Sequence, residues 1–250
     1  MDAIANGSQQ PSLGDAVAAI RKRKMEATQQ LLGDTIRLDD AEWQAPSLLP
    51  GWTRAHVATH IARNADGLRR SVRGFLDGHP QRMYPSELDR QDDLEKGSRR
   101  TGLDLQIDLD TSASELNETM NELAAQPDEL LARDVELRAG FRVPAHMVAT
   151  ARLNEIVLHR IDLGMGFSVD QLEPDIARWL LEWAVFRLDD RVDVPRLDII
   201  SASGLKASVG GFGEPIKVTG PDRYLLGWLS GRAGADHLTG AENVVMPLIG

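Results

Sequence analysis

The chain contains no cysteine. This absence excludes disulfide bonds, zinc sites with thiolate ligands, iron–sulfur clusters and a cysteine nucleophile. Any thiol chemistry must therefore use sulfur from a bound molecule. Basic residues are outnumbered, with 28 Lys and Arg against 38 Asp and Glu, which gives a formal net charge of −10. That balance argues against a nucleic-acid-binding surface or a polybasic membrane patch.

Several other features are absent as well. No segment approaches the apolar length needed to span a bilayer, and residues 1–16 lack the charged and apolar runs of a secretory signal. There is no Gly-x-Ser-x-Gly nucleophile motif, and the glycine cluster at residues 210–213 lacks the spacing of a nucleotide loop. The few aromatic residues do not interleave with basic ones, which argues against a stacking platform for nucleic acid. We therefore expect a cytoplasmic protein with neither a nucleic-acid nor a membrane partner.

Patterns along the 250 residues divide the chain into three parts. Residues 1–12 are small and polar and predict a disordered lead-in. Helical periodicity dominates residues 13–166, which are expected to form a helical domain. Short β-rich runs, glycine clusters and helices follow, so residues 167–250 are expected to form a smaller α/β domain. The expected fold class is α+β.

Caps and chain breakers place the expected helices. Thr53, after the Pro50-Gly51 turn, is expected to cap a helix that runs to Leu76. Pro144 is expected in the first turn of a helix that ends near Leu163. The remaining expected elements are a long ordered loop or short helix at 80–104, helices at 14–33, 105–125, 174–188 and 221–232, and strands at 197–201, 207–209 and 216–219.

Two of these helices each carry possible metal ligands four residues apart. His56 and His60 lie on the first, and Glu155 and His159 lie on the second. This spacing puts two side chains about 40° apart on one helix face, so that both can approach one ion. His60 lies nearer than His56 to the edge of the apolar stripe of its helix. His60 is therefore the better candidate for a ligand inside the bundle, while His56 is expected beside the site or in solvent.

The second helix is apolar around much of its surface. Against that background Arg152, Glu155, His159 and Asp162 form a polar stripe. Charges on a largely buried helix carry a high desolvation cost unless they are paired or bind a metal. Two histidines and one carboxylate would leave one coordination position open, which is typical of catalytic rather than structural zinc.

Each pattern also has an ordinary interpretation. A pair of histidines four residues apart is most often an accident of the surface or the core edge, and a polar stripe is most often a solvated, salt-bridged face. Their occurrence on two helices of one bundle favours a metal site, but the residues alone leave both interpretations open. His79, His146 and His237 are given no role.

Four segments resemble the mycothiol-dependent maleylpyruvate isomerase family, whose members have a DinB-like helical bundle. The segment GWTRAHVATH at residues 51–60 is similar to the strongest motif of that family, and EIVLHRIDLG at residues 155–164 is similar to another. MYPS at residues 83–86 and LSGR at residues 229–232 resemble two further motifs. The resemblance spans about residues 14–240.

This resemblance implies an N-terminal DinB-like four-helix bundle with a smaller C-terminal α/β domain that closes over it. The metal ligands of the family fall on His60, Glu155 and His159, with zinc as the expected ion, although another divalent metal would also fit. His56 matches a position that is not a ligand. The catalytically important arginine of the family falls on Arg232. Apart from the resemblance, Arg232 would be interpreted as a surface residue that interacts with the last carbonyls of its own helix.

The resemblance also implies an enzyme that uses mycothiol as a thiol cosubstrate and a small electrophile as its substrate. Two activities share these motifs: a maleylpyruvate cis–trans isomerase, which regenerates the thiol, and a mycothiol S-transferase, which consumes it. A third hypothesis is a non-catalytic metal- or ligand-binding protein that retains the three ligands. The motifs specify the metal site but not the electrophile.

Overall fold

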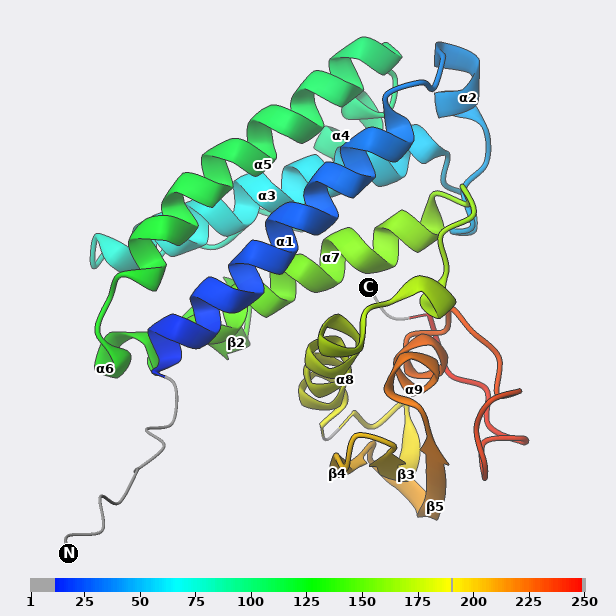
Figure 1. Ribbon diagram of the computed structural model, residues 1–250. Helices are drawn as coiled ribbons and strands as arrows, with labels where there is room; N and C mark the ends of the chain where they lie inside the picture. Colours follow the sequence, from blue (N-terminus) through cyan, green and yellow to red (C-terminus); the bar gives the residue numbers. More distant parts are fainter. Residues whose placement is uncertain (1–11, 190, 249–250) are drawn as a thin grey trace, which may run out of the picture.

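Four long helices form the larger part of the protein, for which a computed structural model describes residues 12–189 and 191–248. These helices lie side by side as a bundle (Figure 1). They are α1 (Leu13–Thr35), α3 (Arg54–Leu76), α5 (Gly102–Ala124) and α7 (Val148–Asp162). Of the predicted lead-in, residues 1–11 lie outside the described residues, and Ser12 is the N-cap of α1.

The helices begin where side-chain oxygens can satisfy free backbone N–H groups. The hydroxyl of Thr53 accepts a hydrogen bond from the N–H of His56, as expected for the predicted start of this helix. Ser12 and Thr101 cap α1 and α5 in the same way. At the end of α3, Gly78 adopts a φ of 72°, a left-handed conformation that suits glycine and allows the chain to reverse.

Short elements join the long helices. They are α2 (Asp40–Gln44), α4 (Glu87–Gly97), α6 (Asp128–Leu131), the antiparallel strands β1 (Asp134–Arg138) and β2 (Phe141–Pro144), and the short 3₁₀ helix η1 (Ala145–Met147). The expected helix start at Pro144 is wrong, because Pro144 ends β2 and α7 begins at Val148. Alternating apolar residues on either side of Ala139-Gly140 are the local signal for this hairpin.

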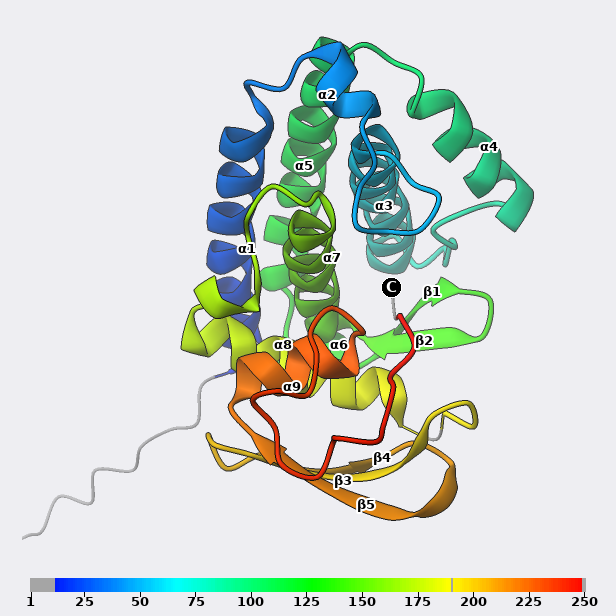
Figure 2. The same ribbon diagram turned by 90° about the vertical axis from the view of Figure 1, so that its right-hand side faces the viewer.

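The C-terminal part contains a small mixed sheet with helices on one side. Its elements are the short 3₁₀ helix η2 (Val169–Gln171), α8 (Pro174–Leu188), β3 (Pro195–Ser201), β4 (Lys206–Val209), β5 (Phe212–Gly220) and α9 (Asp222–Leu229). The strand order is β4-β3-β5, with β3 antiparallel to β4 and parallel to β5. Helices α8 and α9 lie between this sheet and the bundle (Figure 2). The predicted α+β class is confirmed, whereas the last helix ends at Leu229 rather than at residue 232.

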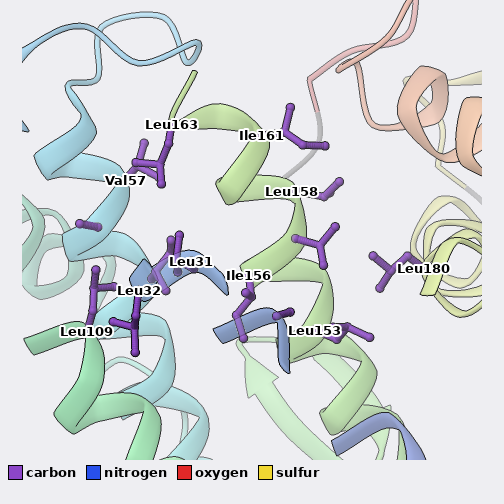
Figure 3. Packing of buried hydrophobic residues seen from close by; sticks show 14 of the residues in the cluster. Leu31, Leu32, Val57, Leu109, Leu153, Ile156, Leu158, Ile161, Leu163 and Leu180 are labelled. Atoms are coloured by element: carbon purple, nitrogen blue, oxygen red, sulfur yellow. The ribbon is translucent and has the colours of Figure 1, made fainter. Parts of the chain in front are cut away.

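The main core is formed by apolar side chains from all four bundle helices. Figure 3 shows Leu31, Val57 and Leu109 packed around the axis of the bundle, with Leu153 of α7 and Leu180 of α8 on the side that faces the C-terminal part. All five are at most 3% exposed. Burial of a leucine side chain contributes roughly 1.5–3 kcal/mol. Because α7 is covered on both sides, its polar residues are buried as well.

Within the described ranges, none of the helices combines the length and the apolarity that crossing a bilayer would require. The cytoplasmic location stays a prediction. So does the division of the chain at residues 166 and 167.

A buried amine in the bundle generates a testable prediction. Lys24 on α1 is 3% exposed, and its Nζ donates a hydrogen bond to Oδ1 of Asn117 at 3.1 Å. Burial, helped by the nearby charges of Arg152 and Arg21, lowers its pKa from 10.5 to about 7. Between these two values the unfolded chain binds more protons than the folded one, so the free energy of unfolding should rise with pH.

We expect Lys24→Met to abolish this rise and to stabilise the fold near pH 7 by up to a few kcal/mol, since one pKa unit corresponds to about 1.4 kcal/mol. Urea unfolding at several pH values between 7 and 10.5 measures the effect. Lys22→Met, which removes an exposed lysine from the same helix, is the control and should keep the wild-type dependence. Parallel pH profiles for wild type and Lys24→Met would contradict the prediction.

Candidate metal centre

The three predicted ligands meet between α3 and α7. Nε2 of His60 lies 3.0 Å from Oε2 of Glu155, and Nε2 of His159 lies 3.5 Å from the same oxygen. One ligand atom from each residue lies within 4.8 Å of the other two. The imidazoles meet edge to face with ring centroids 4.6 Å apart. The structure therefore brings together the three groups that the sequence singled out.

The donor set suits a divalent ion. Two imidazole nitrogens and one carboxylate oxygen are the donors found in many catalytic zinc sites. Ligand distances of about 2.0–2.2 Å to a tetrahedral ion require donor atoms to be about 3.5 Å apart, and the observed contacts with Glu155 are close to that spacing. These residues therefore fit a zinc-like ion.

Electrostatics in the site favour a charged carboxylate beside a neutral imidazole. Burial alone would raise the pKa of Glu155, but contacts with His159 and His60 outweigh it and hold that pKa well below its ordinary value. Burial, together with the charge of His159, lowers the pKa of His60 to about 4. At neutral pH His60 therefore keeps a nitrogen lone pair, and Glu155 keeps its negative charge.

A second carboxylate orients His159 from the Nδ1 side of its imidazole. Oδ2 of Asp162 lies 2.8 Å from Nδ1 of His159. Burial would raise the pKa of Asp162, but hydrogen bonds from His159 and Arg232 lower it, so the carboxylate accepts and Nδ1 donates. This hydrogen bond fixes the imidazole tautomer and leaves Nε2 directed towards Glu155. Such carboxylate–histidine pairs commonly orient metal-ligating histidines.

Arg232 completes this chain of contacts from the C-terminal part. Its Nε and Nη2 donate to the two oxygens of Asp162 at 3.0 and 2.8 Å, and its Nη1 donates to the carbonyl of Ser230 at 2.9 Å. Gly231 makes this approach possible, because its φ of 74° turns the chain just after α9. The side chain of Arg232 is 3% exposed, so the interpretation of Arg232 as a surface residue is wrong.

His56 takes part in helix capping rather than in the cluster. Its Nδ1 lies 2.8 Å from Oγ1 of Thr53, and its Nε2 lies 3.9 Å from Oε1 of Glu95. Its position beside the site agrees with the helical-face argument. His146 contacts the carbonyl of Leu131, and His237 stacks on Tyr224.

The polar stripe on α7 faces inwards throughout. Nη1 of Arg152 donates to the carbonyl of Ile61 and to Oδ1 of Asn64, at 2.7 and 2.8 Å. Nη2 of Arg152 has no hydrogen-bond partner in the described part of the chain. Burial lowers the pKa of Arg152 to about 10, and the nearby negative charge of Glu155 opposes this shift. The interpretation of the stripe as a solvated face is therefore wrong.

A cavity of about 330 Å³ gives access to the cluster from one side. Glu155 lies in its wall, together with residues of α3, α8 and the β1–β2 hairpin. Trp183 and Arg187 of α8 and Arg138 of β1 were not among the residues singled out in the sequence. The alternating pattern of the hairpin could have pointed to Arg138, whereas the two α8 residues carry no local signal.

Comparison with known proteins gives consistent results. Residues 24–164 match the family model described as the mycothiol maleylpyruvate isomerase N-terminal domain. A crystal structure of the mycothiol-dependent maleylpyruvate isomerase is similar with a TM-score of 0.77 and 21% identity, over 96% of this chain and 100% of that one. A histidine-to-alanine mutant of the mycothiol-dependent maleylpyruvate isomerase is similar with a TM-score of 0.78 and 20% identity, over the same shares. These two likenesses show the fold. A search of curated proteins finds no match.

The geometry predicts which substitutions remove a bound metal. His60→Ala, Glu155→Ala and His159→Ala should each lose zinc or bind it at least about tenfold more weakly, because each removes one of three donors. His56→Ala is the matched control and should retain the wild-type zinc content. Elemental analysis after dialysis measures the outcome, with circular dichroism to verify folding. Equal zinc content in all four variants would refute the assignment.

The hydrogen bond behind His159 gives a second prediction. Asp162→Asn keeps the size of the side chain but removes the charge that holds both His159 and Arg232. We expect zinc affinity to fall about 10–100-fold, as is typical when a partner of a ligating histidine is lost. Competition with a chelator measures the affinity. The exposed Asp110→Asn serves as control, and unchanged zinc affinity in Asp162→Asn would contradict this role.

Proposed function

The chain belongs to the family of the mycothiol maleylpyruvate isomerase N-terminal domain, and on that premise we propose that it is a metal-dependent enzyme that activates mycothiol for attack on a small electrophile. The single observation that carries the metal dependence is the approach of His60, Glu155 and His159 to one point beside an open cavity. The activity is a cis–trans isomerisation or a mycothiol S-transfer.

The residues of the chain prepare this site for a thiol. When bound, a divalent ion such as zinc lowers the pKa of a coordinated thiol, so that thiolate is available at neutral pH. His60 and His159 present Nε2 atoms towards Glu155, which supplies the one negative charge among the three donors. Asp162 and Arg232 hold His159 in one tautomer and orientation. This fixed orientation reduces the reorganisation of His159 that thiol binding would require.

The surroundings limit access of water to two of the three proposed ligands. His60 and His159 are 6% and 4% exposed, and the indole of Trp52 lies 5.6 Å from the imidazole of His60, measured between ring centroids. Charge interactions are stronger in such a poorly hydrated site than in water. The cavity beside Glu155 provides a route for a small substrate.

Two outcomes follow from one thiolate attack. Addition of the sulfur to a conjugated double bond converts that bond to a single bond, which can rotate. Elimination of the same sulfur then restores the double bond in the trans form and releases the thiol. In an S-transferase the carbon–sulfur bond persists and the adduct leaves.

The role of Arg232 towards the substrate stays a prediction. A guanidinium can bind a substrate carboxylate or stabilise a developing enolate. Its contacts with Asp162 support an additional positioning role, exerted through Asp162 on His159.

Incubation of the zinc-loaded protein with mycothiol and maleylpyruvate tests the proposal. We expect turnover that requires mycothiol and that falls about 100-fold or more in His159→Ala, because this variant lacks a metal donor. Free thiol that stays constant during turnover indicates the isomerase, and stoichiometric loss of thiol indicates the transferase. His56→Ala is the control and should retain activity. A zinc-loaded protein that neither binds mycothiol nor turns over an electrophile with it would refute the enzyme and support a non-catalytic binding protein.

A further inference from the structure

The cavity beside Glu155 has a wall of unusual charge. Three arginines, Arg138, Arg187 and Arg191, contribute to its lining, and among the described residues that line it Glu155 is the one acid. Arg138 comes from β1, Arg187 from α8 and Arg191 from the segment that follows α8. Figure 2 shows the β1–β2 hairpin between the lower end of α3 and helix α8. Three separate segments thus bring positive charge to one small space.

Contacts within the protein balance this charge only in part. Arg191 forms an ion pair with Asp193. Glu155 is engaged by the two histidines of the metal centre. Arg138 forms no ion pair or hydrogen bond through its side chain with any residue in the ranges 12–189 and 191–248. The positive charge of Arg138 is therefore available to a ligand in the cavity.

The guanidinium groups also influence one another. Burial lowers the pKa of Arg187; the negative charge of Glu155 opposes this shift, and the like charges of Arg138 and Arg191 add to it. Like charges placed around a partly enclosed space destabilise one another unless an anion enters between them. An arginine cluster of this kind suits a carboxylate, which a planar guanidinium can bind through two parallel hydrogen bonds.

Apart from Asn64, the remaining wall is apolar and partly aromatic. The guanidinium carbon of Arg187 lies 5.0 Å from the ring centroid of Phe141 and 5.9 Å from that of Trp183. Leu68 and Met83 add aliphatic surface. A volume of about 330 Å³ is at the small end of ligand sites. The space suits a small planar molecule with an apolar, unsaturated body and an anionic end.

Arg232 is less suited to receive that anionic end. Its guanidinium already donates to both oxygens of Asp162 and to the carbonyl of Ser230, and its side chain is 3% exposed. A substrate carboxylate that displaced Asp162 would leave this buried acid without a partner, which is costly. Arg138, by contrast, lines the cavity without a side-chain partner in residues 12–189 and 191–248, and Arg187 lines it from α8.

We propose that this cavity is the carboxylate-recognition subsite for the electrophile, in which Arg138 and Arg187 hold the carboxylate end while the unsaturated carbons lie towards Glu155. This inference rests on the proposed function, because it assigns the substrate class of the same site. It makes Arg138 and Arg187 specificity-determining residues and separates their role from that of Arg232.

Binding of maleate to the zinc-loaded protein, measured by titration calorimetry without mycothiol, tests the subsite. We expect saturable binding that weakens with rising salt and falls at least about tenfold in Arg138→Met and in Arg187→Met. Arg138→Lys and Arg187→Lys keep the charge and should retain part of the affinity. Arg142→Met is the matched control, because it removes an exposed arginine, paired with Glu136, from the same hairpin. Thermal unfolding and zinc content verify that each variant is folded and loaded.

Several outcomes would overturn the assignment. Equal maleate affinity in wild type and both Met variants would mean that maleate binds elsewhere, for example at the metal alone. Tighter binding of inorganic phosphate than of maleate would indicate a phosphate site instead of a carboxylate site. Arginine-dependent maleate binding without any mycothiol-dependent turnover would contradict the proposed function but not the subsite, so the two failures can be distinguished.

Kinetics with an accepted electrophile provide an independent readout. Arg138→Met should raise KM for a carboxylate substrate with little change in kcat, as expected for loss of binding shared by ground state and transition state. The neutral methyl ester of the same substrate should show no such change. An equal loss of kcat/KM for acid and ester would count against carboxylate recognition by Arg138.

Discussion

The site depends on the buried carboxylate of Asp162, which accepts hydrogen bonds from His159 on one side and from Arg232 on the other. Removal of a charge from water is expensive unless its hydrogen-bonding capacity is met inside the protein. Here Oδ1 of Asp162 accepts a hydrogen bond from Arg232, and Oδ2 accepts hydrogen bonds from both Arg232 and His159. His159 lies on α7, whereas Arg232 follows α9. The orientation of His159, and with it the geometry of the candidate metal centre, follows from that arrangement.

The same contact joins the two parts of the chain. Asp162 ends α7 of the bundle, whereas Arg232 follows α9 beyond the small sheet. The cavity is also shared, since α3, α7 and the hairpin form one side and Trp183 and Arg187 of α8 form the other. The three proposed ligands belong to the bundle alone, but their orientation and the proposed substrate subsite require the C-terminal part. Loss of the C-terminal part would therefore impair the orientation of His159 as well as substrate binding.

Arginines serve three separate purposes around the candidate metal centre. Arg152 is buried beside the carbonyl of Ile61 and supplies positive charge behind Glu155. Arg232 holds Asp162, and Arg138 with Arg187 faces the cavity. Their surroundings separate these roles, because Arg152 and Arg232 are buried against other groups of the protein, whereas Arg138 and Arg187 line a cavity that a ligand can enter. The role of each arginine therefore depends on how far its guanidinium is buried, because the residue type is the same in every case.

Local features of the sequence predicted the long helices and the cap at Thr53, and they favoured His60 over His56, because helical period and capping depend on residues only a few positions apart. They also singled out Glu155 and His159, since a polar stripe on an apolar helix needs a partner wherever the helix packs. The contact of Arg232 with Asp162 and the arginine-lined cavity were decided by tertiary structure. Arg232 and Asp162 are 70 residues apart, and Arg138 meets α8 only after the hairpin has folded against it. Contacts of that kind depend on how whole elements pack, a property that no short stretch of sequence contains.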